Sequence, residues 1–307
     1  MTPPPEASPP TISAVIISCE EADVLEPCLH SVAPWVDEIV VVDMDSTDGT
    51  LEVAQRFTDR IYRHHRLDYG DPARNYALSL ARGEWIIMLD PDERVPSKLA
   101  AELRRIACTG EADVVSIFCQ QIMLGRLTES AGLMDAHHPR FFRQGAVSWP
   151  AGVHEVPDLA GQRVVTLPRT ADLSIVHDTW RSIPVIMDKI ARYAPNDAAQ
   201  LHARGLTFSP RVMIRDVANE IIGRIVYGKA YEDGLAGVFA ALYFAFYRFT
   251  IHAALWEADG RPRSHDRSVA RSVAYIAFVY RVFALAPHLV LRLAARWPAA
   301  ALRKRRG

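Results

Sequence analysis

Short apolar runs alternate with amphipathic segments along the N-terminal part of the chain. The apolar runs are of strand length and occupy residues 12–18, 38–43, 85–90 and 113–119. The segment 21–32 between the first two runs repeats its apolar residues every three or four positions, which is the helical period. Continuous apolar strands that alternate with such helices predict a parallel sheet covered by helices on both faces.

Turn and cap signals place the remaining elements. Pro72 stands at a typical helix start and Gly83 at a typical helix stop, so we expect a helix over residues 72–81. Other elements are expected as helices over 50–57 and 96–107, a short strand at 61–62, and two or three strands, some antiparallel, within 140–177. The chain beyond residue 182 is expected to be helical.

These patterns predict an α/β fold of Rossmann-like type with a mostly parallel sheet and a helical extension. Residues 1–10 contain five prolines and no aromatic residue, so we expect a disordered lead-in. A nucleotide-binding and catalytic domain is expected over residues 11–180, and a helical region over residues 181–307.

Carboxylates stand where two of the predicted strands end. Asp43 closes the second apolar run, and Asp90 and Asp92 close the run that begins at Trp85. Ligands of open parallel sheets bind at the carboxyl ends of the strands. Hard divalent cations such as Mg²⁺ and Mn²⁺ take carboxylate and phosphate oxygens as ligands. The sequence therefore predicts a metal site that meets a phosphorylated ligand at this edge of the sheet.

Each of these acids also has a simpler interpretation. Asp90-Pro-Asp92 has the composition of a solvated turn. Asp43 is placed to cap the next helix, although Ser46 and Asp48 can do the same and leave Asp43 for a ligand. The coincidence of acids at two strand ends favours binding over both alternatives.

Charge is distributed unevenly along a chain whose net charge is only −1. Residues 258–307 hold 11 Lys and Arg against 2 Asp, which leaves 24 basic and 34 acidic residues in the rest. The apolar run Leu235–Tyr247 is too short to span a bilayer by itself, and a second apolar helix with basic residues is expected over 272–293. Apolar and basic residues mixed in this way are typical of a helix in the membrane interface, although ordinary helix core is the alternative.

The partner of this basic region is expected to be an anionic membrane surface. The chain closes on the basic cluster Arg303–Arg306, which suits anionic headgroups. No nucleic-acid-binding motif accompanies the basic residues, so no nucleic-acid partner is expected. The four cysteines lack C-x-x-C spacing, and the N-terminus lacks a charged-then-apolar leader. Together these features predict a cytoplasmic protein, peripheral on the inner face of the cytoplasmic membrane.

Several motifs together resemble the family-2 glycosyltransferases. They are the strand Ile12–Ser18 with Glu21, Asp37-Glu-Ile-Val-Val-Val-Asp43 with Ser46-Thr-Asp-Gly-Thr50, Ala73-Arg-Asn75, and Ala81–Glu93 with its Asp-x-Asp motif. Arg140-Phe-Phe-Arg and Val153-His-Glu155 are similar to the branch that includes lipopolysaccharide-core glucosyltransferases. The resemblance covers about residues 11–179. Met44-Asp45 and Pro91 depart from the residues common in that family.

The resemblance implies a GT-A fold and inverting transfer of a sugar from a nucleotide diphosphate. Carried over by position, Asp43 would bind the base, Glu21 would lie near the ribose, and Arg74 and Asn75 would lie near the diphosphate. Ser18 and Asp90 would belong to the donor site. Asp92 would be the direct metal ligand of the Asp-x-Asp motif, with Asp90 beside it.

Inverting transfer needs a base that takes the proton of the acceptor hydroxyl. The candidate is Glu155, and His154 is the second candidate; both can instead be structural groups of a loop. His177 follows an apolar run and is either a further metal ligand or a satisfied buried histidine.

The function predicted from the sequence is a metal-dependent inverting glycosyltransferase. Its donor would be a UDP-sugar rather than a GDP-sugar, and its acceptor a hydroxyl of a membrane-associated glycan or glycolipid. The alternatives are a sugar nucleotidyltransferase, which would normally carry a glycine-rich phosphate loop after the first strand, and a catalytically idle nucleotide sensor that binds membranes. The sequence leaves the oligomeric state open.

Overall fold

The computed structural model describes residues 8–67, 73–128, 137–150 and 157–261, together with 269–271, 273, 274, 277 and 281. The chain divides into two compact units. The first comprises Met1–Tyr193 and Ile221–Phe244, and the second Ala194–Glu220 and Ala245–Gly307. The predicted domain boundary near residue 180 stays a prediction, and the expected lead-in lies mostly outside the described residues.

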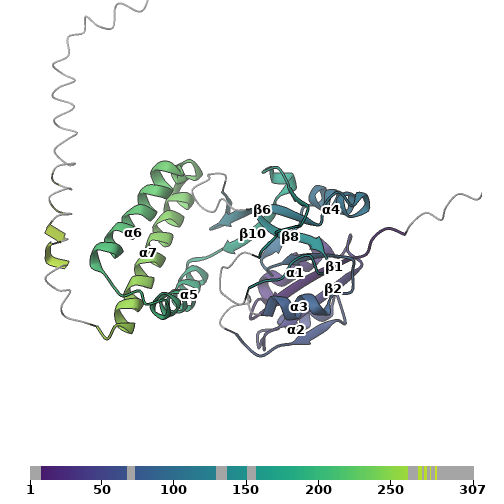
Figure 1. The fold of residues 1–307 in the computed structure, drawn as a ribbon, viewed down its shortest axis with the longest axis horizontal. Coiled ribbons are helices and arrows are strands. Elements are labelled where there is room, and N and C mark those ends of the chain that lie inside the picture. The colour runs from purple at the N-terminus through teal and green to yellow at the C-terminus, as the bar shows by residue number, and fades with distance from the viewer. Residues whose placement is uncertain are drawn as a thin grey trace, which may run out of the picture. The chain divides into compact units, whose positions relative to one another are not determined.

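A mixed sheet forms the centre of the first unit (Figure 1). Its strands are β1 (Ile12–Ser18), β2 (Glu38–Asp43), β3 (Ile61–Arg63), β4 (Trp85–Leu89), β5 (Glu93–Arg94), β6 (Val114–Met123), β7 (Arg126–Leu127), β8 (His137–Arg143), β9 (Val164–Thr166) and β10 (Ile175–Trp180). The main path runs β3-β2-β1-β4-β8-β6-β10-β5. Strands β1 to β4 are parallel, and β8 is antiparallel to both β4 and β6.

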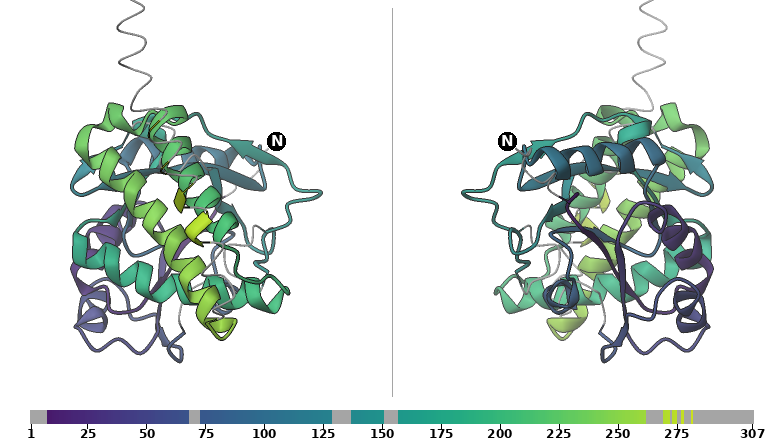
Figure 2. Two further views of the ribbon diagram at one scale, coloured as in Figure 1. Left: turned by 90° about the vertical axis from the view of Figure 1, so that its left-hand side faces the viewer. Right: turned by 90° about the vertical axis from the view of Figure 1, so that its right-hand side faces the viewer.

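Helices cover both faces of this sheet (Figures 1 and 2). They are α1 (Ala22–Val32), α2 (Thr50–Gln55), α3 (Arg74–Leu80) and α4 (Ser97–Thr109). Alternate residues of a strand point to opposite faces, and the two cores follow this rule. Ile16 of β1 packs in the core formed with α1 and α4, whereas Val15 packs in the core formed with α3.

The predicted α/β class with helices on both faces is confirmed; the sheet is mixed, with the parallel strands β1 to β4 at one side and antiparallel pairs around β8. The strands expected at 12–18 and 38–43 have the predicted bounds, and the strand expected at 113–119 runs on to Met123. β5 and β7 were not predicted, because two charged or turn-flanked residues carry no strand signal. The insertion of antiparallel β8 between β4 and β6 was not predicted either, and it is what supplies Arg140 to the site below.

Within the described residues, three long helices follow the sheet, as expected beyond residue 182. They are α5 (Ile183–Ala203), α6 (Pro210–Ile222) and α7 (Gly234–Ala258). In the second unit Ile251 and Leu255 of α7 share a core with Phe208, and the Tyr247 hydroxyl donates to Asp197 at 2.5 Å.

The helix that contains the apolar run Leu235–Tyr247 is longer than the run itself. Among the described residues, Ala230–Ala258 is the one stretch long and apolar enough to cross a membrane by length and composition, and 33% of its most apolar window is buried. This is weak evidence of a span, because core helices of soluble proteins pass the same test. The second apolar helix, expected over 272–293, falls almost entirely outside the described residues.

The close approach of Gly83 to β1 generates a stability prediction. A Cβ at Gly83 would lie 2.7 Å from both the backbone nitrogen and Oγ of Ser13, which accepts the Gly83 N–H at 2.8 Å. Gly83→Ala should therefore destabilise the fold by about 1–3 kcal/mol through overpacking. The control is Gly223→Ala, where nothing lies within 4 Å. Equal melting temperatures for the two variants would contradict this account of the packing.

Candidate active site

The acids predicted at the end of β4 fold back into a tight turn. The Asp90 N–H donates to Glu93 Oε2 at 2.9 Å, and the Glu93 N–H donates to the Asp90 carbonyl at 2.9 Å. Glu93 is fully buried as the first residue of β5, and Asp92 is 5% exposed. Three carboxylates thus gather at the carboxyl end of a central strand, where each needs a cation or a donor to remain ionised.

Arginines neutralise Asp90 and Glu93. Arg140 of β8 places Nη2 2.8 Å from Asp90 Oδ2 and 2.6 Å from Glu93 Oε1, with its side chain 8% exposed. Arg74, at the start of α3, has Nη2 3.6 Å from Asp90 Oδ1. From the sequence alone Arg140 belongs only to a family motif, and Glu93 has no predicted role. The signal that points to both is that each is a charged residue next to an apolar strand segment, where burial calls for an opposite charge.

A different pair of cations holds Asp92. His177 of β10 has Nε2 3.1 Å from Asp92 Oδ1, and Lys189 of α5 has Nζ 3.2 Å from Oδ2. The Asp92 carbonyl also accepts the Asp178 N–H at 2.9 Å. His177 is brought here because it pairs with Glu93 in the β10–β5 ladder. The structure therefore places Asp90, Asp92 and His177 together, and adds Glu93 and Lys189.

These ion pairs set the charge states of the cluster. Burial would raise the pKa of Asp92, but the His177 imidazolium and the Lys189 ammonium outweigh it and hold that pKa well below its usual range. Burial would also raise the pKa of Asp90, which Arg140 holds far below its usual value. Burial opposes a charged His177, yet Asp92 raises its pKa to about 9.

The cluster suits a divalent cation. Asp90, Glu93 and His177 each offer a ligand atom within 4.8 Å of the others. The 3.1 Å between Asp92 Oδ1 and His177 Nε2 also fits two ligands of one ion, each about 2.1 Å from it, once the imidazolium has given up its proton to make room for the metal. Carboxylate oxygens with one imidazole suit Mg²⁺ or Mn²⁺, with Mn²⁺ the more tolerant of nitrogen.

Asp43 and Ser18 lie at the carboxyl ends of β2 and β1. They are register partners in the parallel pair, and both are fully buried. Asp43 Oδ2 accepts the Ser46 N–H at 3.1 Å, whereas neither Asp43 Oδ1 nor Ser18 Oγ has a partner. The N-terminal turn of α2 is served instead by Asp48, which accepts from Thr50. The capping alternative for Asp43 is therefore not what the structure shows, and a buried carboxylate oxygen is left for a donor.

Glu21 stands just before α1, at the rim of the acid cluster. The Thr50 Oγ1 binds its backbone N–H at 3.0 Å. Burial raises the pKa of the Glu21 carboxyl to about 7, and the nearby Asp92 carboxylate adds to the effect while the Lys189 ammonium opposes it. A carboxyl that is partly protonated near neutral pH can both donate and accept hydrogen bonds.

Asn75 holds the backbone of Trp149. Its Nδ2 donates to the Trp149 carbonyl at 2.7 Å, and its Oδ1 accepts the Trp149 N–H at 2.9 Å. Both ends of the amide are thus engaged with the backbone. Glu155 and His154, the two candidate bases, lie outside the described residues.

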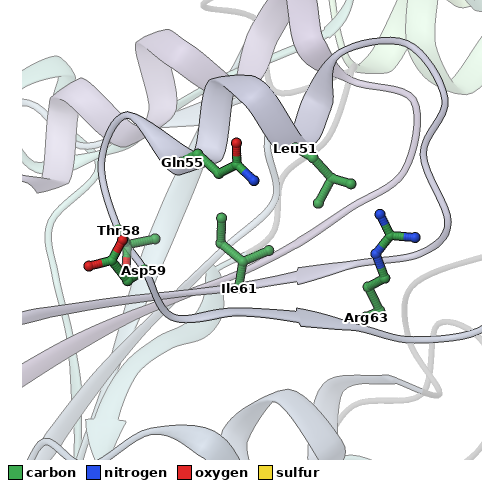
Figure 3. Close-up of a pocket in the computed structure, with 6 residues that line it drawn as sticks. All are labelled: Leu51, Gln55, Thr58, Asp59, Ile61 and Arg63. Carbon is green, nitrogen blue, oxygen red and sulfur yellow. The ribbon is translucent and has the colours of Figure 1, made fainter.

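A pocket of about 490 Å³ lies at the edge strand β3, where its lining residue Arg63 is the register partner of Asp43. Figure 3 shows Leu51 and Gln55 of α2 on one side of it and Ile61 and Arg63 of β3 on the other. It shares no residue with the acid cluster or with the Ser18–Asp43 pair.

A family model and several relatives identify a glycosyltransferase domain in this chain. Residues 13–164 match the model described as glycosyl transferase family 2. An uncharacterized glycosyltransferase of Rickettsia felis is 33% identical over 33% of this chain and 36% of its own. Another, from Rickettsia typhi, is 21% identical over 82% of this chain and 89% of its own.

One solved structure similar to this chain contains both a metal ion and a donor. It is the glucosyl-3-phosphoglycerate synthase of Mycobacterium tuberculosis in complex with Mn²⁺ and UDP-glucose. It is 25% identical over 36% of this chain and 44% of that one, with a TM-score of 0.32. The first curated relatives are matched over about a third of their own length.

His138, beside the cluster on β8, generates a pH prediction. Burial, with the Arg140 charge adding to it, lowers the pKa of His138 from 6.5 to about 4. Because the folded pKa lies below the unfolded one, this histidine stabilises the fold above pH 6.5 and loses that contribution as the pH falls through 4. His138→Asn should remove up to about 3 kcal/mol of this pH dependence. Urea unfolding between these pH values measures it, and parallel curves for both proteins would contradict it.

Proposed function

We propose, from the premise that residues 13–164 form a glycosyltransferase family 2 domain, that the chain transfers a sugar from a UDP-sugar to a hydroxyl group. The transfer would proceed with inversion, by single displacement at the anomeric carbon. The lipopolysaccharide-core branch stays a resemblance, and the acceptor and the sugar belong to the proposal.

The observation that carries the donor assignment is the unpartnered oxygen of buried Asp43. Its other oxygen is already engaged with Ser46, so one acceptor position remains. Uracil presents a single ring N–H between two carbonyls, which suits one carboxylate oxygen with the nearby Ser18 hydroxyl as donor. Guanine presents two adjacent N–H donors and would need both oxygens. Adenine and cytosine present a ring acceptor where this site needs a donor. This favours UDP.

The acid cluster would serve the diphosphate. Asp90, Asp92, Glu93 and His177 are the residues that would hold a divalent cation. Such an ion, when bound, supplies Lewis-acid stabilisation of the leaving diphosphate. Arg74, beside Asp90, would add a charge-assisted hydrogen bond to a phosphate oxygen. The acceptor proton would go to Glu155, with His154 as the second candidate.

A membrane-associated acceptor is supported by α7. Its large apolar side chains at Leu235, Phe239, Leu242, Phe246 and Phe249 are each at least 42% exposed. Their spacing of four, three, four and three residues places them on one face of the helix. A solvated stripe of this length is unusual for a soluble helix and suits a lipid interface, with the basic residues of the tail attracting anionic headgroups.

Asp92→Asn tests the metal assignment. The amide keeps the shape of the side chain but removes its charge, so transfer should fall at least about 100-fold. UDP-sugar hydrolysis without acceptor should fall in parallel, while circular dichroism stays unchanged. Asp59→Asn is the control, since Asp59 is an exposed acid that has no contact with the acid cluster. Near-normal activity of Asp92→Asn would contradict the assignment.

Glu155→Gln tests the base. Loss of a general base should lower turnover by about 10²–10⁴-fold while UDP affinity changes little. His154→Asn is the matched variant and should retain most of the turnover. If the two variants behave the other way round, His154 takes the role; if neither lowers turnover, the base lies elsewhere.

Phe239→Glu combined with Leu242→Glu tests the membrane surface. The double variant should abolish cosedimentation with vesicles that contain anionic phosphatidylglycerol, because two charges would enter the apolar interface. Leu206→Glu, at a residue 52% exposed outside α7, is the control and should sediment like the unchanged protein. Equal sedimentation of all three proteins would show that the stripe does not bind lipid.

A further inference from the structure

Lys189 is a partly buried cation of the site that no sequence motif marks. It lies on α5, and its side chain is 19% exposed. Its Nζ donates to Thr179 Oγ1 at 2.6 Å and to Asp92 Oδ2 at 3.2 Å. Ile186 and Ile190 on the same helix are buried, so the turns of α5 on either side of Lys189 are packed against the protein. Lys189 is therefore held against the carboxylate by its helix and by Thr179.

This contact completes the neutralisation of the acid cluster. Asp90 and Glu93 share Arg140, with Arg74 beside Asp90, and the two oxygens of Asp92 are taken by His177 and Lys189. Among the described residues, each of the three carboxylates thus already has a cation within salt-bridge distance. A free divalent cation that approaches Asp92 meets the charge of Lys189 and must compete with it for the same oxygen.

A nucleoside diphosphate changes this balance. Its phosphate oxygens carry several negative charges and accept hydrogen bonds from an ammonium group as readily as a carboxylate does. A lysine has a flexible stem and three donors, so it can pair with phosphate and leave the Asp92 oxygen to a metal ion. Arg74 and Arg140 pair with Asp90 and Glu93, whereas the Lys189 ammonium pairs with Asp92, beside His177.

We infer that Lys189 is a positioning residue that couples metal binding to nucleotide binding. While Lys189 pairs with Asp92, a divalent cation alone binds weakly. When Lys189 pairs with the diphosphate instead, the Asp92 oxygen is released and the cation binds together with the nucleotide. The inference rests on the proposed function, since it takes a nucleoside diphosphate as the ligand. The coupling is reciprocal: Mn²⁺ strengthens binding of UDP by the same factor as UDP strengthens binding of Mn²⁺.

The test is the dissociation constant of Mn²⁺, measured by electron paramagnetic resonance with and without saturating UDP. In the unchanged protein UDP should tighten Mn²⁺ binding at least tenfold. In Lys189→Met, Mn²⁺ alone should bind about tenfold more tightly, because a unit charge a few ångströms from a divalent ion is removed. The effect of UDP on Mn²⁺ affinity should shrink accordingly.

Two further variants serve as controls. Lys189→Arg keeps the charge and should retain weak binding of Mn²⁺ alone. Tighter binding in Lys189→Met but not in Lys189→Arg would assign the effect to the lost charge. Arg192→Met removes a charge from the same helix, where Arg192 pairs with Asp188 at 2.9 Å, and should behave like the unchanged protein.

Unchanged or weaker binding of Mn²⁺ alone in Lys189→Met would overturn the inference. If the unchanged protein binds both Mn²⁺ and UDP and the Mn²⁺ affinity does not depend on Lys189, the inference fails and the proposed function stands. An unchanged protein that binds neither ligand would overturn the proposed function and this inference together.

Discussion

The burial of Asp92 and Glu93 beside the partly exposed Asp90, at the end of β4, is the constraint on which the rest of this structure depends. Breaking a buried ion pair typically costs about 3–5 kcal/mol, so the fold must bring cations to these acids. They come from four places in the chain: Arg74 from α3, Arg140 from β8, His177 from β10 and Lys189 from α5. The antiparallel insertion of β8 and the parallel pairing of β10 with β6 are thus requirements of the site as much as of the sheet.

The two acidic strand ends differ in the partners that their carboxylates have. The acids after β4 are paired with cations, which suits a place where a metal ion and a diphosphate exchange for those partners. Asp43, after β2, instead keeps one buried oxygen without a partner, which suits a neutral donor such as a uracil N–H. Burial is common to both ends, and the partner that each lacks is what separates the proposed base-binding position from the proposed metal-binding position.

Sequence patterns sufficed for the parts governed by local rules. The strands at 12–18 and 38–43 follow from continuous Val and Ile runs, and the position of the acids follows from the rule that parallel strands end together. No role in the site could be predicted for Glu93, Arg140 or Lys189, because their importance arises from contacts between segments far apart in sequence. Local periodicity contains no information about such contacts, nor about the insertion of β8 or the engagement of the Asn75 amide with Trp149.

The central claim, that this chain binds a uridine diphosphate sugar through Asp43 with a divalent cation, is tested most directly by thermal unfolding of the full chain with Mn²⁺ and a panel of nucleotides. UDP and UDP-sugars should raise the melting temperature, since ligand at 100 times its dissociation constant stabilises by about 2.7 kcal/mol. ADP and CDP should not, and Asp43→Ala should abolish the rise. Equal stabilisation by every nucleotide, or by none, would contradict the account.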